Sequence, residues 1–159
     1  PYQHKDLDKW RENFVGVQYL HETSNLLLHG AIDDVWKTEE GELIVVDYKA
    51  TSKKDKVNIH APWQRGYKRQ IEFYQWLLRK NGFKVSDTGY FVYCNGRRNL
   101  DTFNGRVEFD VDLLSYNGND GWVEDTVKEI AGCLNQNSLP LPDERCEQCK
   151  YNQTVVKYY

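Results

Sequence analysis

Residues 26–49 read LLLHGAIDDVWKTEEGELIVVDYK, and this stretch decides how the chain folds. Two apolar runs, 26–28 and 43–46, flank a polar segment at 38–42 that contains a glycine. Apolar runs of this length are typical of buried strands, and a short polar segment with a glycine is typical of a hairpin turn. The stretch therefore predicts a β-hairpin centred on Glu40.

This hairpin brings two acidic residues together. Centred on Glu40, it places Asp33 opposite Asp47, because each lies seven residues from the centre. Directly opposed side chains are about 5 Å apart at Cβ, and two like charges there are destabilising. A divalent cation would offset the repulsion, and Lys49, two residues past Asp47, emerges on the same strand face. The pattern predicts a metal-dependent phosphodiesterase site with two carboxylate ligands.

The remaining periodicity predicts an α/β protein. The order β-β-β-α-β-β-α suits a mixed β-sheet of about five strands flanked by α-helices. Residues 51–64 are predicted to form a polar loop that closes over substrate, and Pro140 and Pro142 to end regular structure. The predicted elements are a helix at 6–13, strands at 15–21, 26–35 and 42–50, a helix at 66–80, strands at 89–95 and 105–113, and a helix at 122–134.

Length and composition indicate a globular protein. The chain has 159 residues, of which 40% are hydrophobic, including five Trp, eleven Tyr and six Phe. No apolar run approaches the roughly 20 residues that span a bilayer, and no signal peptide is visible, so we expect a cytoplasmic protein without a membrane partner. The chain begins at Pro1 and contains no methionine. We therefore expect residues 1–159 to be a single domain in an N-terminally truncated fragment, whose oligomeric state the sequence does not predict.

Positive charge is concentrated in one segment. Residues 50–84 hold nine basic and two acidic side chains, a net +7; the whole chain carries −3, which leaves −10 for the remainder. Positive charge directly after the proposed site is what a phosphodiester backbone needs. Near the end of the predicted helix, Arg79 and Lys80 are also explained as a solvated helix face. The side chains predicted to bind nucleic acid are Lys53, Lys54, Lys56, Arg65, Lys68 and Arg69.

Three motifs occur in a characteristic order: G-x-x-D at 30–33, D-x-K at 47–49 and Q-x-x-x-Y at 70–74. Together they resemble the PD-(D/E)XK nuclease superfamily, in particular its RecB-like branch, which includes CRISPR-associated adaptation nucleases. The resemblance implies a restriction-endonuclease-like fold. It also implies a Mg²⁺- or Mn²⁺-dependent deoxyribonuclease, and it favours exonuclease action.

The same resemblance implies roles for individual residues. The backbone carbonyl of Tyr48 would join the two aspartates as a metal ligand, with the Tyr48 side chain facing the core. Lys49 would stabilise charge that grows in the transition state. Gln70, a polar residue on an otherwise apolar helix face, would contact the lysine, a ligand water or the substrate. The implied catalytic residues are Asp33, Asp47, Lys49, Gln70 and Tyr74.

Other interpretations of these residues stay open. Asp47 and Lys49 are also explained as a surface ion pair of little energetic value. Gln70 is also explained as a core glutamine bonded to backbone, and Tyr74 as plain core packing. At the level of the whole chain, the alternative is a catalytically inactive module that retains the nuclease fold and serves nucleic-acid binding or assembly.

A cysteine pair near the C-terminus has the spacing of a metal knuckle, Cys146-x-x-Cys149. Several RecB-like nucleases hold an iron–sulfur cluster with cysteines on both sides of the nuclease core. In this chain no cysteine precedes the core and none follows Cys149. An iron–sulfur or zinc site at this pair therefore requires ligands from outside the chain.

Overall fold

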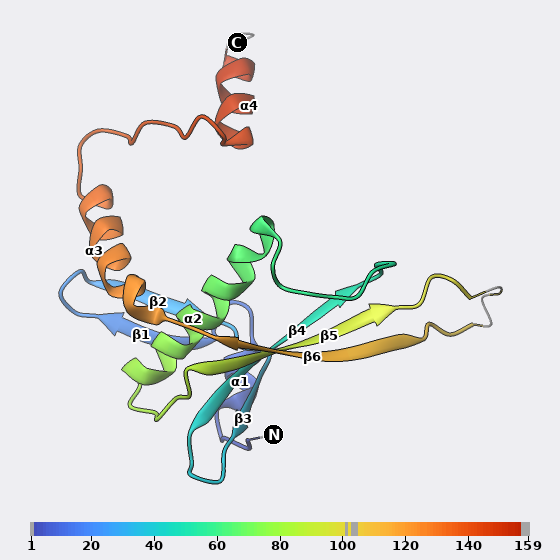
Figure 1. The fold of residues 1–159 in the computed structure, drawn as a ribbon. Coiled ribbons are helices and arrows are strands. Elements are labelled where there is room, and N and C mark those ends of the chain that lie inside the picture. The colour runs from blue at the N-terminus through green and yellow to red at the C-terminus, as the bar shows by residue number, and fades with distance from the viewer. Residues whose placement is uncertain (1, 101, 103–104, 157–159) are drawn as a thin grey trace. The chain divides into compact units, whose positions relative to one another are not determined.

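The computed structural model describes residues 2–100, 102 and 105–156. The chain falls into two compact units, residues 1–124 and 125–159; the expectation of one nuclease domain over 1–159 stays a prediction. The elements, shown in Figure 1, are α1 (Leu7–Arg11), β1 (Val17–His21), β2 (Leu26–Gly30), β3 (Asp34–Lys37), β4 (Leu43–Thr51), η1 (Pro62–Gln64), α2 (Arg65–Lys80), β5 (Thr88–Gly96), β6 (Phe109–Asn117), η2 (Asp120–Trp122), α3 (Val123–Leu134) and α4 (Glu147–Val155).

A four-stranded mixed sheet forms the centre of the first unit. Its strand order is β3-β4-β5-β6; β4 and β5 are parallel, and the two outer pairs are antiparallel. A separate antiparallel hairpin joins β1 to β2. The predicted α/β class with a mixed sheet is confirmed.

The strand predicted at 26–35 is in fact two strands in different sheets. β2 pairs with β1, whereas β3 pairs with β4. The break falls at residues 31–33, where Ile32 is fully buried. Gly30 is the last residue of β2, and it must lack a side chain because a Cβ there would lie 2.6 Å from a ring carbon of Tyr74, closer than packed atoms allow. The apolar pattern alone did not reveal this change of partner.

The β3–β4 hairpin has the predicted register. Asp34 pairs with Val46 and Lys37 pairs with Leu43, so the pairing is centred on position 40. Gly41 supplies the positive φ of 88° that the turn requires. Asp33 therefore lies one position before Asp34, the first residue of β3, and falls opposite Asp47 on β4.

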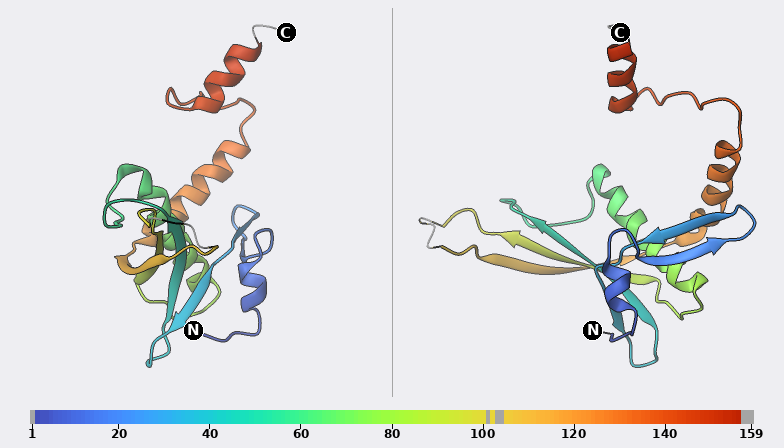
Figure 2. Two further views of the ribbon diagram at one scale, coloured as in Figure 1. Left: turned by 90° about the vertical axis from the view of Figure 1, so that its right-hand side faces the viewer. Right: turned by 180° about the vertical axis from the view of Figure 1, so that it is seen from behind.

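Helix α2 lies against both the β1–β2 hairpin and strand β4 (Figure 2). Its apolar side buries Ile71, Leu77 and Leu78 completely, and each such side chain contributes about 1.5–3 kcal/mol relative to exposure. Gly89 on β5 permits the close approach, since a Cβ there would lie 2.7 Å from Ile71. The helix thus covers the sheet face onto which the odd-numbered residues of central β4 project.

The later part of the chain departs more from expectation. β6 covers 109–117 and not 105–113, because it pairs with the full length of β5, from Gly96↔Phe109 to Thr88↔Asn117. Helix α4 follows the two prolines, with the Cys146 sulfur accepting a hydrogen bond at its start.

Among the described residues, no helix is both long and apolar enough to cross a membrane.

Candidate active site at the end of the central hairpin

Two neighbouring aspartates at the start of β3 have different surroundings. Asp34 is 5% exposed, and its carboxylate accepts hydrogen bonds from Arg11 (2.9 Å), the backbone N–H of Val35 (2.9 Å) and the hydroxyl of Tyr48 (3.1 Å). Asp33 is exposed, and one oxygen accepts from the backbone N–H of Tyr48 at 2.8 Å. Both oxygens of the Asp34 carboxylate are thus used in hydrogen bonds that hold the fold, whereas the Asp33 carboxylate has an oxygen available to bind a metal ion.

Asp47 is the buried carboxylate of the site. Asp47 is 1% exposed, yet among the described residues only Lys49 compensates its charge directly, with Nζ 2.9 Å from Oδ1 and 2.7 Å from Oδ2. Burial raises the pKa of Asp47, Lys49 lowers it, and the negative charge of Asp33 raises it again. This buried pair differs from the surface ion pair that the sequence also allowed.

Lys49 connects β4 to helix α2. Besides Asp47, its ammonium donates to Oε1 of Gln70 at 3.2 Å and lies 4.5 Å from the ring centroid of Tyr67. These contacts fix the ammonium between two acceptors and an aromatic face. Lys49 and Gln70 are 21 residues apart in the sequence, and their hydrogen bond joins the D-x-K motif to the Q-x-x-x-Y motif.

Gln70 and Tyr74 form one hydrogen-bonded pair on α2. The Gln70 amide donates to the Tyr74 hydroxyl at 2.8 Å, so both hydrogen bonds found for Gln70 go to side chains of the candidate site. Tyr74 is 7% exposed and packs over Gly30, so it also serves core packing. Burial raises the pKa of Tyr74, with further contributions from the charges of Asp47 and Asp33. The glycine of G-x-x-D thus makes room for the tyrosine of Q-x-x-x-Y.

One expectation at this site is wrong. The Tyr48 side chain does not face the core: it is 47% exposed, and its hydroxyl donates to Asp34. On a strand, residues 47 and 49 project to one face and residue 48 to the other, and the face opposite α2 is open here. The backbone carbonyl of Tyr48 stays a predicted metal ligand.

The available oxygen atoms suit a hard cation. Asp47 Oδ2 is buried without a well-directed hydrogen bond, although Lys49 Nζ lies nearby. Among the described residues, no group of three or more His, Cys, Asp or Glu side chains is arranged to hold a metal. Mg²⁺ typically binds through one or two carboxylates and keeps several waters, so the pair Asp33 and Asp47 is compatible with such an ion.

The basic side chains of the +7 segment divide into two groups. Arg79 bonds Asp87 and Asp120, Lys80 pairs with Glu124, and Lys84 pairs with Glu42. The six residues predicted to bind nucleic acid have no carboxylate partner within the described part of the chain. They are Lys53, Lys54, Lys56, Arg65, Lys68 and Arg69.

Lys68 and Arg69 do not point to the Asp47–Lys49 pair, although they precede Gln70 directly. Lys68 lies 5.5 Å from the ring of Tyr116, and Arg69 lies 5.2 Å from the ring of Trp122. With Glu72 and Arg65 they line a separate hollow of about 270 Å³. A helix turns by about 100° per residue, which separates this side of α2 from that of Gln70.

The cysteine pair lies in the second unit. Cys146 and Cys149 are free thiols, and the Cys146 sulfur accepts a hydrogen bond from the backbone N–H of Cys149 at 3.4 Å. Backbone hydrogen bonding at the start of α4 lowers the pKa of Cys146. Two thiols are too few for an iron–sulfur cluster or a closed zinc site. A role as ligands stays a prediction that depends on atoms from outside the chain.

Sequence reasoning missed three contributors to the site. Arg11 donates to the backbone carbonyl of Asp33 at 3.0 Å and so fixes the turn before β3; no local pattern connects residues this far apart. Tyr67 stands under the Lys49 ammonium, and Trp63 contacts Tyr67 edge-on at 5.5 Å between centroids. Tyr67 could have been found, because it lies three residues before Gln70 on the same helix side.

The family model described as the PD-(D/E)XK nuclease superfamily matches residues 2–154. No curated protein matches the chain. The matched range contains the mixed sheet, the β3–β4 hairpin and all three motifs whose side chains meet around Lys49, and the restriction-endonuclease-like fold is confirmed. On this evidence the chain belongs to the PD-(D/E)XK nuclease superfamily, whose fold implies a nucleic-acid substrate.

Proposed function

We propose that this protein is a metal-dependent deoxyribonuclease that hydrolyses phosphodiester bonds at the Asp33–Asp47–Lys49 site. The supporting observation is the Asp47 carboxylate, which is 1% exposed and is held against a lysine beside a second acid. Burying a carboxylate with so little compensation is costly for a purely structural purpose. A cation at the site would offset this cost.

The proposed cofactor is Mg²⁺ or Mn²⁺, held by Asp33, Asp47 and the Tyr48 carbonyl. When bound, such an ion activates a water and neutralises charge on the phosphate. Lys49 Nζ donates hydrogen bonds to Asp47 and Gln70, so its proposed role is to stabilise the negative charge of the transition state. Gln70 orients that ammonium through its Oε1 atom, and Tyr74 orients Gln70 in turn.

The unpaired basic side chains support a polyanionic substrate. Six of the nine basic residues in 50–84 lack a carboxylate partner among the described residues, and they surround the N-terminal end of α2 and the end of β4. Phosphate contacts of this kind supply affinity without reading sequence. The Q-x-x-x-Y element that meets Lys49 favours the RecB-like branch, and with it exonuclease action on DNA. A cytoplasmic location stays a prediction.

The test is cleavage of linear DNA by the purified protein with Mg²⁺, with Mn²⁺ and with EDTA. Cleavage should require the added ion. Asp47→Asn should lower the rate by more than the roughly 10- to 100-fold that loss of an outer-shell partner costs. The matched control is Glu124→Gln, which removes another lysine-paired carboxylate and should leave the rate unchanged. DNA binding without metal-dependent cleavage would instead identify the inactive module that retains the fold.

A further inference from the structure

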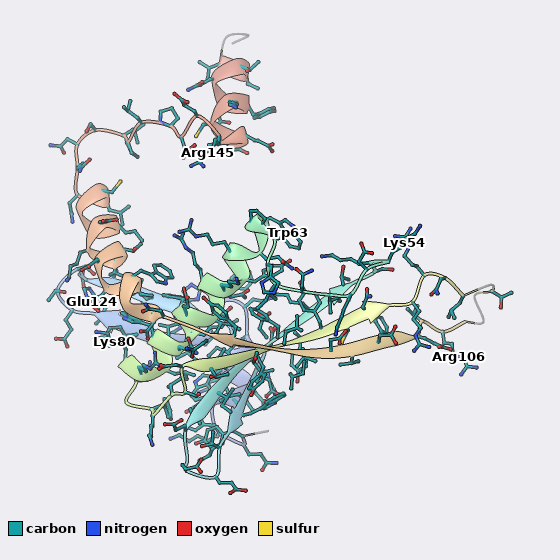
Figure 3. All side chains as sticks on the ribbon, in the orientation of Figure 1. Lys54, Trp63, Lys80, Arg106, Glu124 and Arg145 are labelled. Atoms are coloured by element: carbon teal, nitrogen blue, oxygen red, sulfur yellow. The ribbon has the colours of Figure 1, made fainter. Side chains whose placement is uncertain are left out.

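Two aromatic rings in contact, with a lysine at each end, form a row that leads outward from the candidate site. Lys49 lies 4.5 Å from the ring centroid of Tyr67, Tyr67 contacts Trp63 edge-on at 5.5 Å, and Lys53 lies 5.0 Å from the ring centroid of Trp63. The last ring of the row is open to solvent, since Trp63 is 58% exposed. Figure 3 shows Trp63 at the N-terminal end of α2.

The exposure of Trp63 is imposed by its neighbours. The next residue, Gln64, is fully buried; its amide accepts from the backbone N–H of Ala61 (2.9 Å) and donates to the carbonyl of Asn58 (2.6 Å) and to Tyr93 (3.2 Å). Val57 and Ile59 are also buried, so the polar loop predicted over residues 51–64 is anchored in the core. A large aromatic ring is thus held outward on a fixed support, which is the arrangement that stacking requires.

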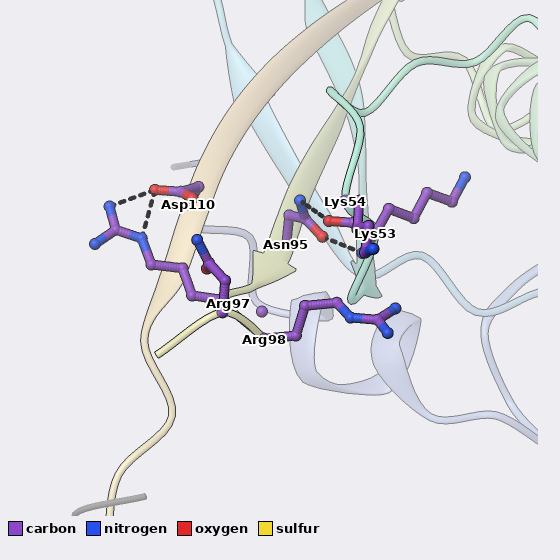
Figure 4. Close-up of a pocket in the computed structure, with 8 residues that line it drawn as sticks. Lys53, Lys54, Asn95, Arg97, Arg98 and Asp110 are labelled. Carbon is purple, nitrogen blue, oxygen red and sulfur yellow. Dashed lines mark hydrogen bonds and ion pairs between the residues drawn. The ribbon is translucent and has the colours of Figure 1, made fainter. Parts of the chain in front are cut away.

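Beyond Lys53 the row opens into a cationic hollow of about 360 Å³, drawn in Figure 4. Asn95 fixes one wall by bonding the backbone N–H of Lys53 at 2.8 Å and its carbonyl at 3.2 Å. Arg97 forms an ion pair with Asp110, whereas Lys54 and Arg98 have no carboxylate partner in the described part of the chain. Two cations are therefore available to phosphate.

The hollow lies one to a few nucleotides from the proposed chemistry. Asn95 pairs with Thr51, which is four residues beyond Asp47 on β4, or about 13 Å at 3.3 Å per residue. The other hollow on α2 is less suited to a nucleotide. Its Glu72 carboxylate accepts from the neutral groups of Tyr116, Asn119 and Trp122 and has no ion-pair partner among the described residues, whereas Asp110 in the first hollow is paired with Arg97.

We infer that Trp63 and the hollow beyond Lys53 form a nucleotide-binding site separate from the catalytic site. An unpaired base stacks on the exposed Trp63 ring, and the phosphates next to it contact Lys54 and Arg98. The inference rests on the proposed function in one respect, the path of the bound DNA strand. That strand runs from Asp47 over Tyr67 to Trp63. A base inside a duplex has both faces covered by its neighbours, so the site takes an unpaired segment.

The test measures binding without catalysis, so that it does not depend on cleavage. Fluorescence anisotropy in EDTA compares a labelled oligo-dT strand with a blunt duplex of equal length. Trp63→Ala should weaken binding of the single strand about 5- to 150-fold and leave duplex binding unchanged, whereas Trp63→Phe should keep most of the affinity. The control is Phe14→Ala, which removes a 93% exposed aromatic ring from the segment between α1 and β1 and should change nothing.

A salt titration separates the two parts of the site. Stacking releases few counterions, so Trp63→Ala should keep the parent log–log salt slope, whereas Lys54→Ala with Arg98→Ala should reduce it by about 1.4, roughly 0.7 for each phosphate. Unchanged single-strand affinity in Trp63→Ala, or an equal loss on duplex, would overturn the inference. A parent protein that fails to cleave but shows these binding effects would overturn only the proposed nuclease function.

Discussion

A carboxylate–lysine pair lies beside each half of helix α2, and the pKa of the carboxyl group is shifted in opposite directions in the two pairs. Near its first half, Gln70 contacts the Asp47–Lys49 pair; in its last turn, Lys80 pairs with Glu124 at 2.8 Å (Figure 3). Burial raises the pKa of Asp47. Hydrogen bonds from Lys80 and His21 instead lower the pKa of Glu124 to about 2.

Solvation explains the difference. The Asp47 side chain is 1% exposed, whereas that of Glu124 is 34% exposed and also receives His21 at 2.9 Å. In the buried pair, desolvation raises the pKa of Asp47 more than Lys49 lowers it. In the exposed pair, hydrogen bonds from Lys80 and His21 lower the pKa of Glu124 more than its small desolvation raises it. A carboxylate–lysine pair thus stabilises the fold near the C-terminal end of α2, whereas the carboxylate of the pair near Gln70 keeps negative charge that a cation could neutralise.

The largest expected effect concerns the two lysines. Lys49→Ala should lower single-turnover DNA cleavage by about 100- to 1000-fold, the loss typical of one preorganised donor at a transition state, while Mn²⁺ binding stays largely intact because an ammonium cannot ligate. Lys80→Ala should keep the parent rate within a few-fold. Equal rates for Lys49→Ala and the parent protein would remove Lys49 from the mechanism.

Next in size is the effect of cations without a carboxylate partner. Lys68→Ala combined with Arg69→Ala should weaken DNA binding across sequences and reduce the log–log salt slope by about one to two units, because phosphates are no longer neutralised. Lys84→Ala, in the same +7 segment but paired with Glu42 at 3.2 Å, is the control and should leave the slope unchanged. If the double variant titrates like the parent, DNA does not contact this side of α2.

The smallest effect is a pH dependence at the exposed pair. The folded-state pKa of Glu124 is about 2 against an ordinary 4.5, so its contribution to stability is present above pH 4.5 and is lost as the pH falls towards 2. Because the side chain is partly exposed, we expect at most about 1 kcal/mol. Urea unfolding should show Glu124→Gln less stable than the parent at pH 6, with a smaller gap at pH 3. A gap that does not change with pH would contradict this assignment.

Local sequence patterns predicted the core of the candidate site. The polar turn fixed the hairpin register at position 40, and strand alternation placed Asp47 and Lys49 on one face. Helical spacing placed Gln70 on the side of α2 that reaches Lys49. These features depend on residues close in sequence, where periodicity carries the information.

Contacts between distant residues were not predictable in this way. Arg11 reaches Asp34 across 23 positions, and the Glu72 carboxylate accepts from Trp122 across 50. Tyr74 packs over Gly30 at the end of β2, and the apolar run at 26–28 reveals neither this contact nor the change of sheet between β2 and β3. Tyr48 is exposed because nothing among the described residues of its unit buries its ring, a fact of tertiary packing and not of strand alternation.

The convergence of Asp33 and Asp47 on one cation is tested most directly by a crystal structure of the protein soaked with Mn²⁺. The anomalous signal should show one ion with carboxylate oxygens of both residues about 2.0–2.4 Å away, while the equivalent position beside Glu124 and Lys80 shows none. Parallel crystals of Asp47→Asn should lose the signal. An ion bound elsewhere, or Asp33 and Asp47 on opposite faces of the sheet, would contradict the proposed site.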